Sequence, residues 1–336
     1  MIHRRGIQYM DSELNYLNGA HCETTATGTL LKHIGIELSE PMLFGIGEGL
    51  GYIYWDMKNM NFPFLGGRIK PDFLTNNIVK NLNLEIFLEE TTSIKKAWQN
   101  VKKTLDDGHP VGLKLDSYYL DYFSDKVHFA GHYVAMYDYD DAYAYLIDTK
   151  QQGNIVKTKL EHLAQARNAK GPMSSKNLSY TIKQDRPLPD MKTVILNAIH
   201  NNARDYLNPP IKNIGYKGIK KTSDKIQTWF ERSSNIQYDL LLTANLMENG
   251  GTGGALFRKM YLSFLEEAKL LIKDSALEQS YHLFSEIVIM WEAVIMLIKC
   301  AGETQDRAYL KQASDILVDL SVKEYDAMKR LLEVKK

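Results

Sequence analysis

The pattern of apolar residues changes character once along the chain, and this change constrains the fold most strongly. Before the segment 185–190 (Asp-Arg-Pro-Leu-Pro-Asp), short apolar runs separated by turn residues predict strands mixed with helices. Beyond it, long segments with helical periodicity predict helices alone. Two prolines among polar residues are typical of a linker, and 336 residues are enough for two domains. We therefore expect an α+β chain with domains at 1–184 and 185–336.

The first part of the chain shows both kinds of local pattern. Val111–Leu115 follows a cluster of turn residues and predicts a strand. His132–Tyr139 and Ala142–Ile147 are rich in aromatic and β-branched residues and flank two aspartates, which predicts a β-hairpin with an acidic turn. Apolar residues at helical spacing occur in Glu23–Ile34 and Ile94–Leu105. Strands and helices are therefore expected within one domain.

The second part predicts a helical bundle. Helical patterns cover Met191–Tyr206, Ser223–Trp229, Ala255–Leu271, Ala276–Cys300 and Arg307–Leu332. Short connections between amphipathic helices make sequential helices antiparallel neighbours, as in bundles. This domain is therefore expected to be all-α.

Composition excludes several functions. The chain carries 41 basic and 41 acidic residues, whereas a protein that binds nucleic acid needs a basic excess. Its 2 cysteines are too few for a disulfide framework and indicate a reducing compartment. Residues 1–6 are not followed by an apolar run of signal-peptide length, and Glu286 and Glu292 interrupt the most apolar stretch, Leu283–Cys300. We expect a cytoplasmic protein that binds neither nucleic acid nor membranes. The histidines lack metal-ligand spacing, so no metal ion or cofactor is expected.

Cys22, His132 and Asp148 form the pattern of most chemical interest. Cys22 opens a predicted helix, where free N–H groups and a partial positive charge stabilise a thiolate. His132 begins one strand of the predicted hairpin and Asp148 ends the other, so we expect their side chains side by side. A histidine between a thiolate and a carboxylate is the arrangement of nucleophile, base and orienting group. Taken singly, the residues also fit a packing cysteine, a structural histidine and a turn aspartate.

Two glycine-rich segments are candidates for close backbone contacts. Gly45–Gly51 predicts a loop whose backbone approaches a strand or a ligand. Gly250–Gly254 precedes a predicted helix, whose free N–H groups would bind an anion such as a phosphate or a carboxylate. The alternative is a tight turn that allows close packing between the domains. The residues expected to touch such an anion are Gly251, Thr252, Gly253 and Arg258.

Several motifs resemble those of known families. The helix start at Cys22, followed by the strands of His132 and Asp148, is similar to the papain-like C39 group of cysteine peptidases. Nearly the whole chain resembles the butirosin biosynthesis protein H-like family. The motifs that carry this resemblance are His21–Ala26, Leu43–Trp55, Leu65–Arg68, Asp116–Leu120, Gly131–Asp141, Tyr145–Asp148 and Gly250–Arg258. The resemblance implies a papain-like N-terminal domain fused to a helical domain.

The resemblance also implies an activity. It implies an acyltransferase that moves an acyl or aminoacyl group to an amine. The donor would be an acyl carrier protein or another acyl thioester, and the acceptor a small-molecule amine. Cys22 would be the nucleophile, His132 the base and Asp148 the residue that orients the imidazole. Glu48 and Arg68 lie in family motifs and would hold an amine or a carboxylate, or pair with each other.

The chain departs from the peptidase pattern just before Cys22. Papain-like peptidases usually place a glutamine there as an oxyanion donor, whereas the nearest side-chain amides here are Asn15 and Asn18. Backbone N–H groups near Cys22 are therefore expected to bind the oxyanion, with Asn18 as a further candidate. The alternatives to a transferase are a peptidase or amidase with the same catalytic residues, and a non-catalytic protein that binds a carrier or a peptide.

Overall fold

The computed structural model describes residues 14–335 except 59, 125 and 172. Residues 1–6, where no signal peptide is expected, lie outside the described residues. In the part of the chain that is described, no helix combines the length and the apolarity that crossing a membrane requires.

The described chain forms two compact units, each made of two stretches. The first contains the residues up to Leu38 together with Phe87–Ile182, and the second contains Ser39–Ile86 together with the chain from Lys183 onward. Most strands lie in the first unit and most helices in the second, which confirms the expected α+β class. The chain changes units close to the expected linker, but residues 39–86 group with the helical unit instead of with the rest of 1–184.

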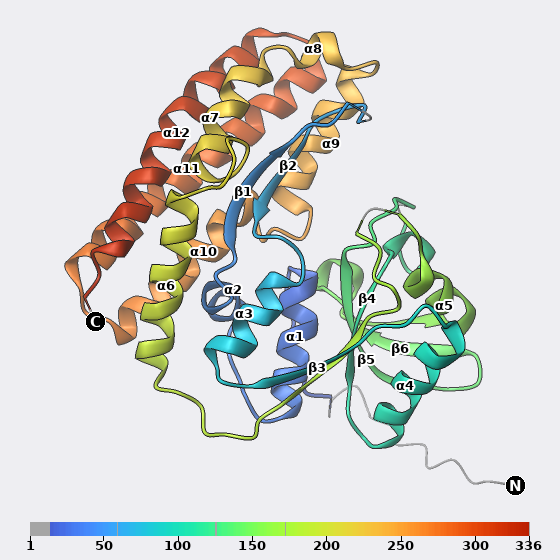
Figure 1. The fold of residues 1–336 in the computed structure, drawn as a ribbon. Helices are drawn as coiled ribbons and strands as arrows, with labels where there is room; N and C mark the ends of the chain where they lie inside the picture. Colours follow the sequence, from blue (N-terminus) through green and yellow to red (C-terminus); the bar gives the residue numbers. More distant parts are fainter. Residues whose placement is uncertain (1–13, 59, 125, 172, 336) are drawn as a thin grey trace, which may run out of the picture. The chain divides into compact units, whose positions relative to one another are not determined.

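The first unit is built on a sheet with the strand order β3-β8-β4-β5-β6-β7 (Figure 1). Its strands are β3 (Glu85–Glu89), β4 (Val111–Leu115), β5 (His132–Tyr139), β6 (Tyr143–Ile147), β7 (Ile155–Lys159) and β8 (Ser179–Lys183). Its helices are α1 (Cys22–His33), α4 (Ile94–Asp106) and α5 (Leu160–Asn168), with 3₁₀ turns η1 (Ser117–Tyr119) and η2 (Lys150–Gln152). The strands and helices predicted for this unit are confirmed to within one residue at each end.

The two faces of this sheet pack against different helices. Leu113 of β4 belongs to a buried cluster that includes Val101 of α4 and residues of α5. Its neighbour Gly112 points to the opposite face, because side chains alternate along a strand. On that face the ring of Tyr180 of β8 lies where a Cβ at Gly112 would be, 2.2 Å away, and its hydroxyl lies 3.2 Å from the Thr27 hydroxyl of α1. The sheet is thus enclosed between α1 on one side and α4 and α5 on the other.

The predicted hairpin is formed by β5 and β6. The two strands are antiparallel, with Ala135 opposite Ile147. Asp140 closes the acidic turn, since its Oδ1 accepts the N–H groups of Ala142 and Tyr143, each at 2.7 Å. The hairpin places the start of β5 and the end of β6 at the same end of the sheet.

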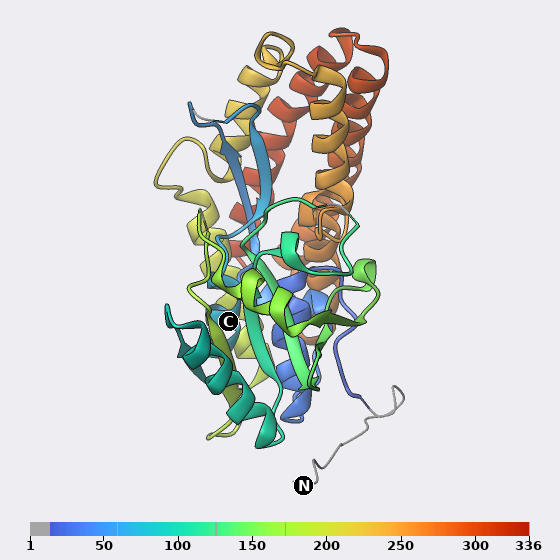
Figure 2. The same ribbon diagram turned by 90° about the vertical axis from the view of Figure 1, so that its right-hand side faces the viewer.

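The second unit combines a hairpin with a helical bundle. Its elements are α2 (Glu40–Ile46), β1 (Leu50–Trp55), β2 (Phe64–Arg68), α3 (Phe73–Asn81), α6 (Met191–Leu207), α7 (Gly215–Ile226), α8 (Trp229–Arg232), α9 (Ile236–Asn249), η3 (Ala255–Phe257), α10 (Arg258–Leu271), α11 (Ser275–Thr304) and α12 (Ala308–Leu332). The long helices α11 and α12 lie side by side in both views (Figures 1 and 2). The helix predicted at Ser223–Trp229 was misplaced, because α7 ends at Ile226 and a separate short helix follows.

The loop predicted at Gly45–Gly51 was wrong at both ends. Helix α2 continues to Ile46 and strand β1 begins at Leu50, so only the three residues between them form a turn. A Cβ at Gly45 would lie 2.1 Å from the Phe264 ring of α10. The backbone makes close approaches at both ends of this segment. Gly45 meets helix α10, and a Cβ at Gly51 would lie 2.8 Å from the Arg68 backbone of β2, which confirms the expected approach to a strand.

Candidate active site

Cys22 is the first residue of α1, as expected. The preceding residue, His21, has an extended backbone with φ −103° and ψ 130°, and its carbonyl accepts the Thr25 N–H at 2.9 Å. The first N–H groups of a helix have no acceptor within the helix, and together with the helix dipole they favour negative charge. Cys22 is buried, with 8% of its surface exposed.

His132 and Asp148 lie against one another at the end of the β5–β6 hairpin. The distance between His132 Nε2 and Asp148 Oδ2 is 2.8 Å, and the two side chains are 8% and 0% exposed. Two residues beyond Asp148, the Lys150 N–H donates to the Gly19 carbonyl at 2.8 Å. This bond attaches the end of the hairpin to the segment just before Cys22.

Cys22 completes the group. Burial lowers the pKa of His132, but the charges of Asp148 and Cys22, and hydrogen bonds with both, raise it to about 10. Because Nε2 bonds Asp148, Nδ1 is the ring nitrogen left for the Cys22 thiol. A histidine with this pKa is protonated at neutral pH, and an imidazolium stabilises a neighbouring thiolate. The structure therefore brings together the three residues that the sequence singles out.

Tyr122 also belongs to this group, although the sequence did not indicate it. Its hydroxyl donates to Asp148 Oδ2 at 2.8 Å, while the Thr149 N–H donates to Asp148 Oδ1 at 2.7 Å. Burial raises the pKa of Tyr122, and the charges of Asp148 and Cys22 raise it further. No local pattern predicts this contact, because it depends on the path of the loop between β4 and β5.

Comparison with protein families identifies the chain. The family model described as "Butirosin biosynthesis protein H, N-terminal" matches residues 21–149, a range that contains Cys22, His132 and Asp148. The model described as "Domain of unknown function (DUF4872)" matches residues 161–331. The chain belongs to the butirosin biosynthesis protein H-like family. No curated protein matches it.

Asn18, the other residue predicted near Cys22, lies just before the matched range 21–149 and takes no part in the contacts described above. Asn18 is exposed, in the irregular segment that leads into α1. Its role as an oxyanion donor stays a prediction. The N–H groups at the start of α1 are the backbone donors that the sequence led us to expect for this task.

Glu48 and Arg68 lie in the second unit, and the described contacts give each an internal partner. Glu48 Oε1 accepts the side-chain amides of Asn81 at 3.1 Å and Asn201 at 2.9 Å. Arg68 ends β2, and its NH1 donates to the Ile69 carbonyl at 3.2 Å. Glu48 therefore joins the turn after α2 to helices α3 and α6. Substrate binding by either residue stays a prediction.

The family's glycine-rich segment Gly250–Gly254 caps helix α9. The Thr252 hydroxyl lies 3.0 Å from the Met247 carbonyl and 2.9 Å from the Glu248 carbonyl, both in the last turn of α9. The next helix begins at Arg258, not at Ala255 as predicted, because residues 255–257 all have positive φ. These contacts favour a tight turn at this segment, and packing between the domains stays a prediction. Anion binding by Gly251, Thr252 and Gly253 stays a prediction.

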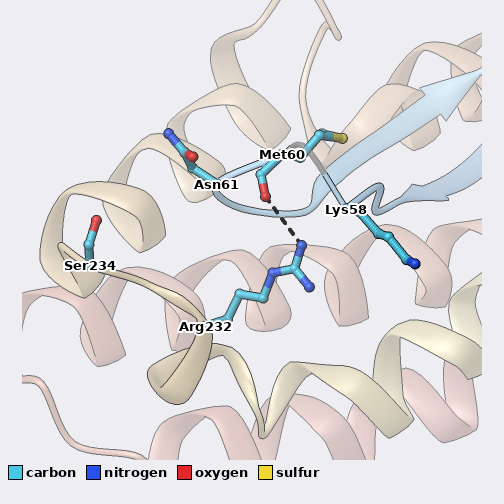
Figure 3. Close-up of a pocket in the computed structure, with 5 residues that line it drawn as sticks. All are labelled: Lys58, Met60, Asn61, Arg232 and Ser234. Carbon is cyan, nitrogen blue, oxygen red and sulfur yellow. Dashed lines mark hydrogen bonds between the residues drawn. The ribbon is translucent and has the colours of Figure 1, made fainter.

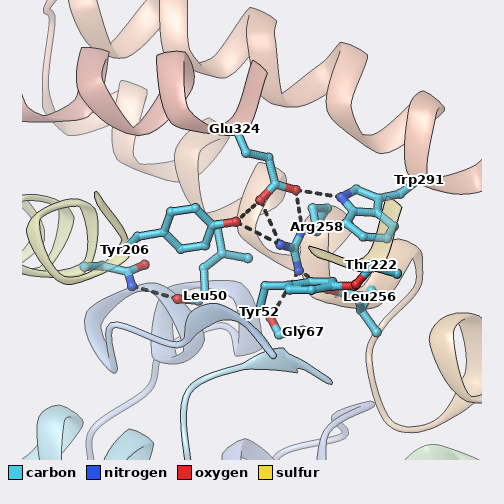
Figure 4. A network of polar contacts seen from close by, with 10 residues as sticks. Leu50, Tyr52, Gly67, Tyr206, Thr222, Leu256, Arg258, Trp291 and Glu324 are labelled. Carbon is cyan, nitrogen blue, oxygen red and sulfur yellow. Dashed lines mark hydrogen bonds and ion pairs between the residues drawn. The ribbon is translucent and has the colours of Figure 1, made fainter. Parts of the chain in front are cut away.

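Arg258 is fully buried and bonded within the second unit (Figure 4). Its Nε and NH2 each donate to the Glu324 carboxylate at 2.8 Å, and its NH1 donates to the Leu256 carbonyl at 2.8 Å. Trp291 Nε1 at 2.6 Å and the Tyr206 hydroxyl also donate to Glu324. The guanidinium thus holds α10 to α12, and the ligand role expected for Arg258 gains no support from these contacts.

A solvent-facing hollow of about 500 Å³ lies in the second unit, near the turn between β1 and β2 (Figure 3). It is lined by Lys58, Met60, Asn61, Arg232 and Ser234. Arg232 NH2 bonds Asp56 at 2.6 Å and the Met60 carbonyl at 3.3 Å. None of these residues belongs to the group around Cys22. Among the described residues, no cluster of three or more His, Cys, Asp or Glu side chains is arranged to hold a metal ion.

Proposed function

We propose that the chain is an acyltransferase of papain-like cysteine type. Cys22 takes an acyl group from a thioester and passes it to an amine. The family is named for butirosin biosynthesis, which supports a biosynthetic enzyme that acts in the production of an antibiotic or another secondary metabolite. The observation that carries the chemical part is the 2.8 Å bond between His132 and Asp148, with the Cys22 thiol hydrogen bonded to the same imidazole.

The first half-reaction forms an acyl-enzyme. The Cys22 thiolate attacks the carbonyl carbon of the donor thioester, and a new C–S bond forms. The C–S bond to the donor then breaks, and the His132 imidazolium gives its proton to the departing donor thiolate. N–H groups at the start of α1 stabilise the negative oxygen of the tetrahedral intermediate.

The second half-reaction transfers the acyl group. The amine attacks the Cys22 thioester, and the neutral His132 imidazole accepts the amine proton. The C–S bond to Cys22 breaks, which restores the thiolate beside a protonated histidine. Asp148 holds Nε2, so that Nδ1 stays directed toward the sulfur throughout.

The acyl donor is inferred from the reactivity of a thiolate, and the acyl acceptor from the family resemblance. A thioester on an acyl carrier protein, or another acyl thioester, supplies a carbonyl that a thiolate attacks readily. A small amine is the acceptor that the family resemblance implies. If water took the place of the amine, the same residues would make the protein a peptidase or amidase.

The ratio of amide to free acid tests the proposal. The chain is incubated with an acyl thioester of N-acetylcysteamine, a mimic of a carrier arm, and with a panel of small amines. We expect amide as the main product, formed only when Cys22 is present, with Cys22→Ala as the control. Acid as the sole product from every amine would indicate a hydrolase. Absence of both products with every thioester would favour a binding protein.

A further inference from the structure

The Asp148 carboxylate receives hydrogen bonds from three directions. His132 Nε2 and the Tyr122 hydroxyl both lie 2.8 Å from Oδ2, and the Thr149 N–H lies 2.7 Å from Oδ1. Two of these donors therefore share one oxygen. The Thr149 N–H fixes only Oδ1, so the direction in which Oδ2 faces depends on Tyr122 and His132.

The segment that carries Tyr122 is attached firmly to the sheet. Its neighbour Asp121 accepts the Thr158 hydroxyl at 2.7 Å and the Lys159 N–H at 2.8 Å, and lies 2.6 Å from His162 Nδ1. Burial raises the pKa of Asp121, but these hydrogen bonds outweigh it and leave the pKa below its usual value. Asp121 therefore binds the loop to β7 and α5 as a carboxylate.

The same segment also contacts the imidazole. The ring of Phe123 meets the His132 ring edge-on, with 5.2 Å between centroids. The side chains of Tyr122 and Phe123 both pack against the buried cluster of the sheet. Two consecutive residues thus contact the carboxylate and the histidine of the candidate active site.

We propose that Tyr122 is a positioning residue that holds Asp148 in the orientation in which Oδ2 accepts the His132 N–H. The proposal rests on the proposed function of Cys22, His132 and Asp148. Without the hydroxyl, Oδ2 keeps His132 as its partner but loses the bond that fixes its direction. The imidazole then spends less time in the orientation that stabilises the Cys22 thiolate.

The rate at which iodoacetamide alkylates Cys22 reports this orientation without any substrate. We expect Tyr122→Phe to slow alkylation near neutral pH by about tenfold, the size of effect that loss of one hydrogen bond to a charged group produces. Tyr119→Phe is the matched control, because Tyr119 packs against the same cluster. We expect the alkylation rate of the Tyr119→Phe control to stay within about twofold of that of the unmodified chain, the size of effect expected of a substitution away from the site.

A double-mutant cycle separates positioning from simple support of the fold. If Tyr122 acts through Asp148, then Tyr122→Phe should slow alkylation by less than about twofold in a chain that already carries Asp148→Asn. Equal slowing in both backgrounds would overturn the proposal, and so would equal rates for Tyr122→Phe and Tyr119→Phe.

The outcome for Tyr122 is distinct from the outcome for the reaction. Slower alkylation in Tyr122→Phe, in a chain that yields only free acid from thioesters, would support the positioning role and overturn amine transfer. Unchanged alkylation in a chain that makes amide would overturn the positioning role alone.

Discussion

At the residue scale, the two cysteines differ in a way that separates reactivity from exposure. Cys22 is buried beside His132, whereas Cys300 is partly exposed on α11. Reactivity follows the thiolate fraction more closely than exposure. We expect limiting iodoacetamide near neutral pH to label Cys22 well before Cys300, as read by peptide mass mapping. Equal labelling, or faster labelling of Cys300, would remove Cys22 as the nucleophile.

His132 gives a prediction for stability against pH. Its pKa in the folded chain, about 10, lies above the value of 6.5 for a free histidine, so the folded chain binds this proton more tightly than the unfolded chain. The resulting stabilisation is complete below about pH 6.5 and is lost as pH rises through about 10. We expect the gap in urea midpoint between the natural chain and His132→Gln to narrow from about pH 6 to about pH 10. A difference in urea midpoint that stays constant or widens over this pH range would contradict an ion pair between His132 and Asp148.

The residues of the candidate site were predictable to different degrees. The hairpin pattern alone places His132 and Asp148 side by side, whereas Cys22 was grouped with them only through the pattern of nucleophile, base and orienting group and through the family resemblance. Tyr122 lies in a loop, and its partner is reached only through the tertiary fold. Arg258, which was predicted to contact an anion, forms a buried ion pair with Glu324. The sequence did not reveal this pair, because Glu324 lies in a different helix and no local pattern links the two.

At the scale of elements, prediction succeeded where periodicity is clean and failed where it is not. Helix α9 was missed because three leucines in succession, Leu240–Leu242, obscure its apolar face. A loop was predicted at the end of α2 because a glycine inside a helix normally destabilises that helix. Here Gly45 is needed for the approach of α10, which a single sequence does not reveal.

The buried pair of Arg258 and Glu324 gives a prediction for the helical unit. Both side chains are 0% exposed, so Glu324→Gln would leave an unpaired buried guanidinium. We expect a loss of about 3–5 kcal/mol in the free energy of unfolding, measured with urea. The control is Glu333→Gln on the exposed end of α12, where a change within about 0.5 kcal/mol is expected. A loss below about 1 kcal/mol for Glu324→Gln would show that the pair is not closed to water.

At the scale of the whole molecule, the chain crosses between its compact units more than once. Residues 39–86 belong to the helical unit although they precede most of the sheet. Phe44 stacks on Phe257 with 5.3 Å between ring centroids, and the Tyr52 hydroxyl lies 2.6 Å from that of Thr222. Sequence patterns predict a domain boundary only where composition changes along the chain. They therefore do not show that residues 39–86 belong to the second unit.

This division predicts the fate of a truncated chain. Residues 1–184 alone would keep the sheet but would leave the apolar residues of 39–86 without their helical partners. We expect this fragment to self-associate in size-exclusion chromatography with light scattering, whereas the full chain gives a defined species. A monomeric fragment with a single cooperative unfolding transition would contradict the division.

If Cys22 carries the acyl group during transfer, mass mapping of the acylated enzyme detects that group on a single peptide. The chain is mixed with an acyl thioester of N-acetylcysteamine, quenched in acid and digested. We predict one acyl adduct on the peptide that contains Cys22, no adduct on the Cys300 peptide, and loss of the adduct when an amine acceptor is added before quenching. Turnover at the natural rate in Cys22→Ala, or an adduct that forms only at Cys300, would show that Cys22 does not carry the acyl group.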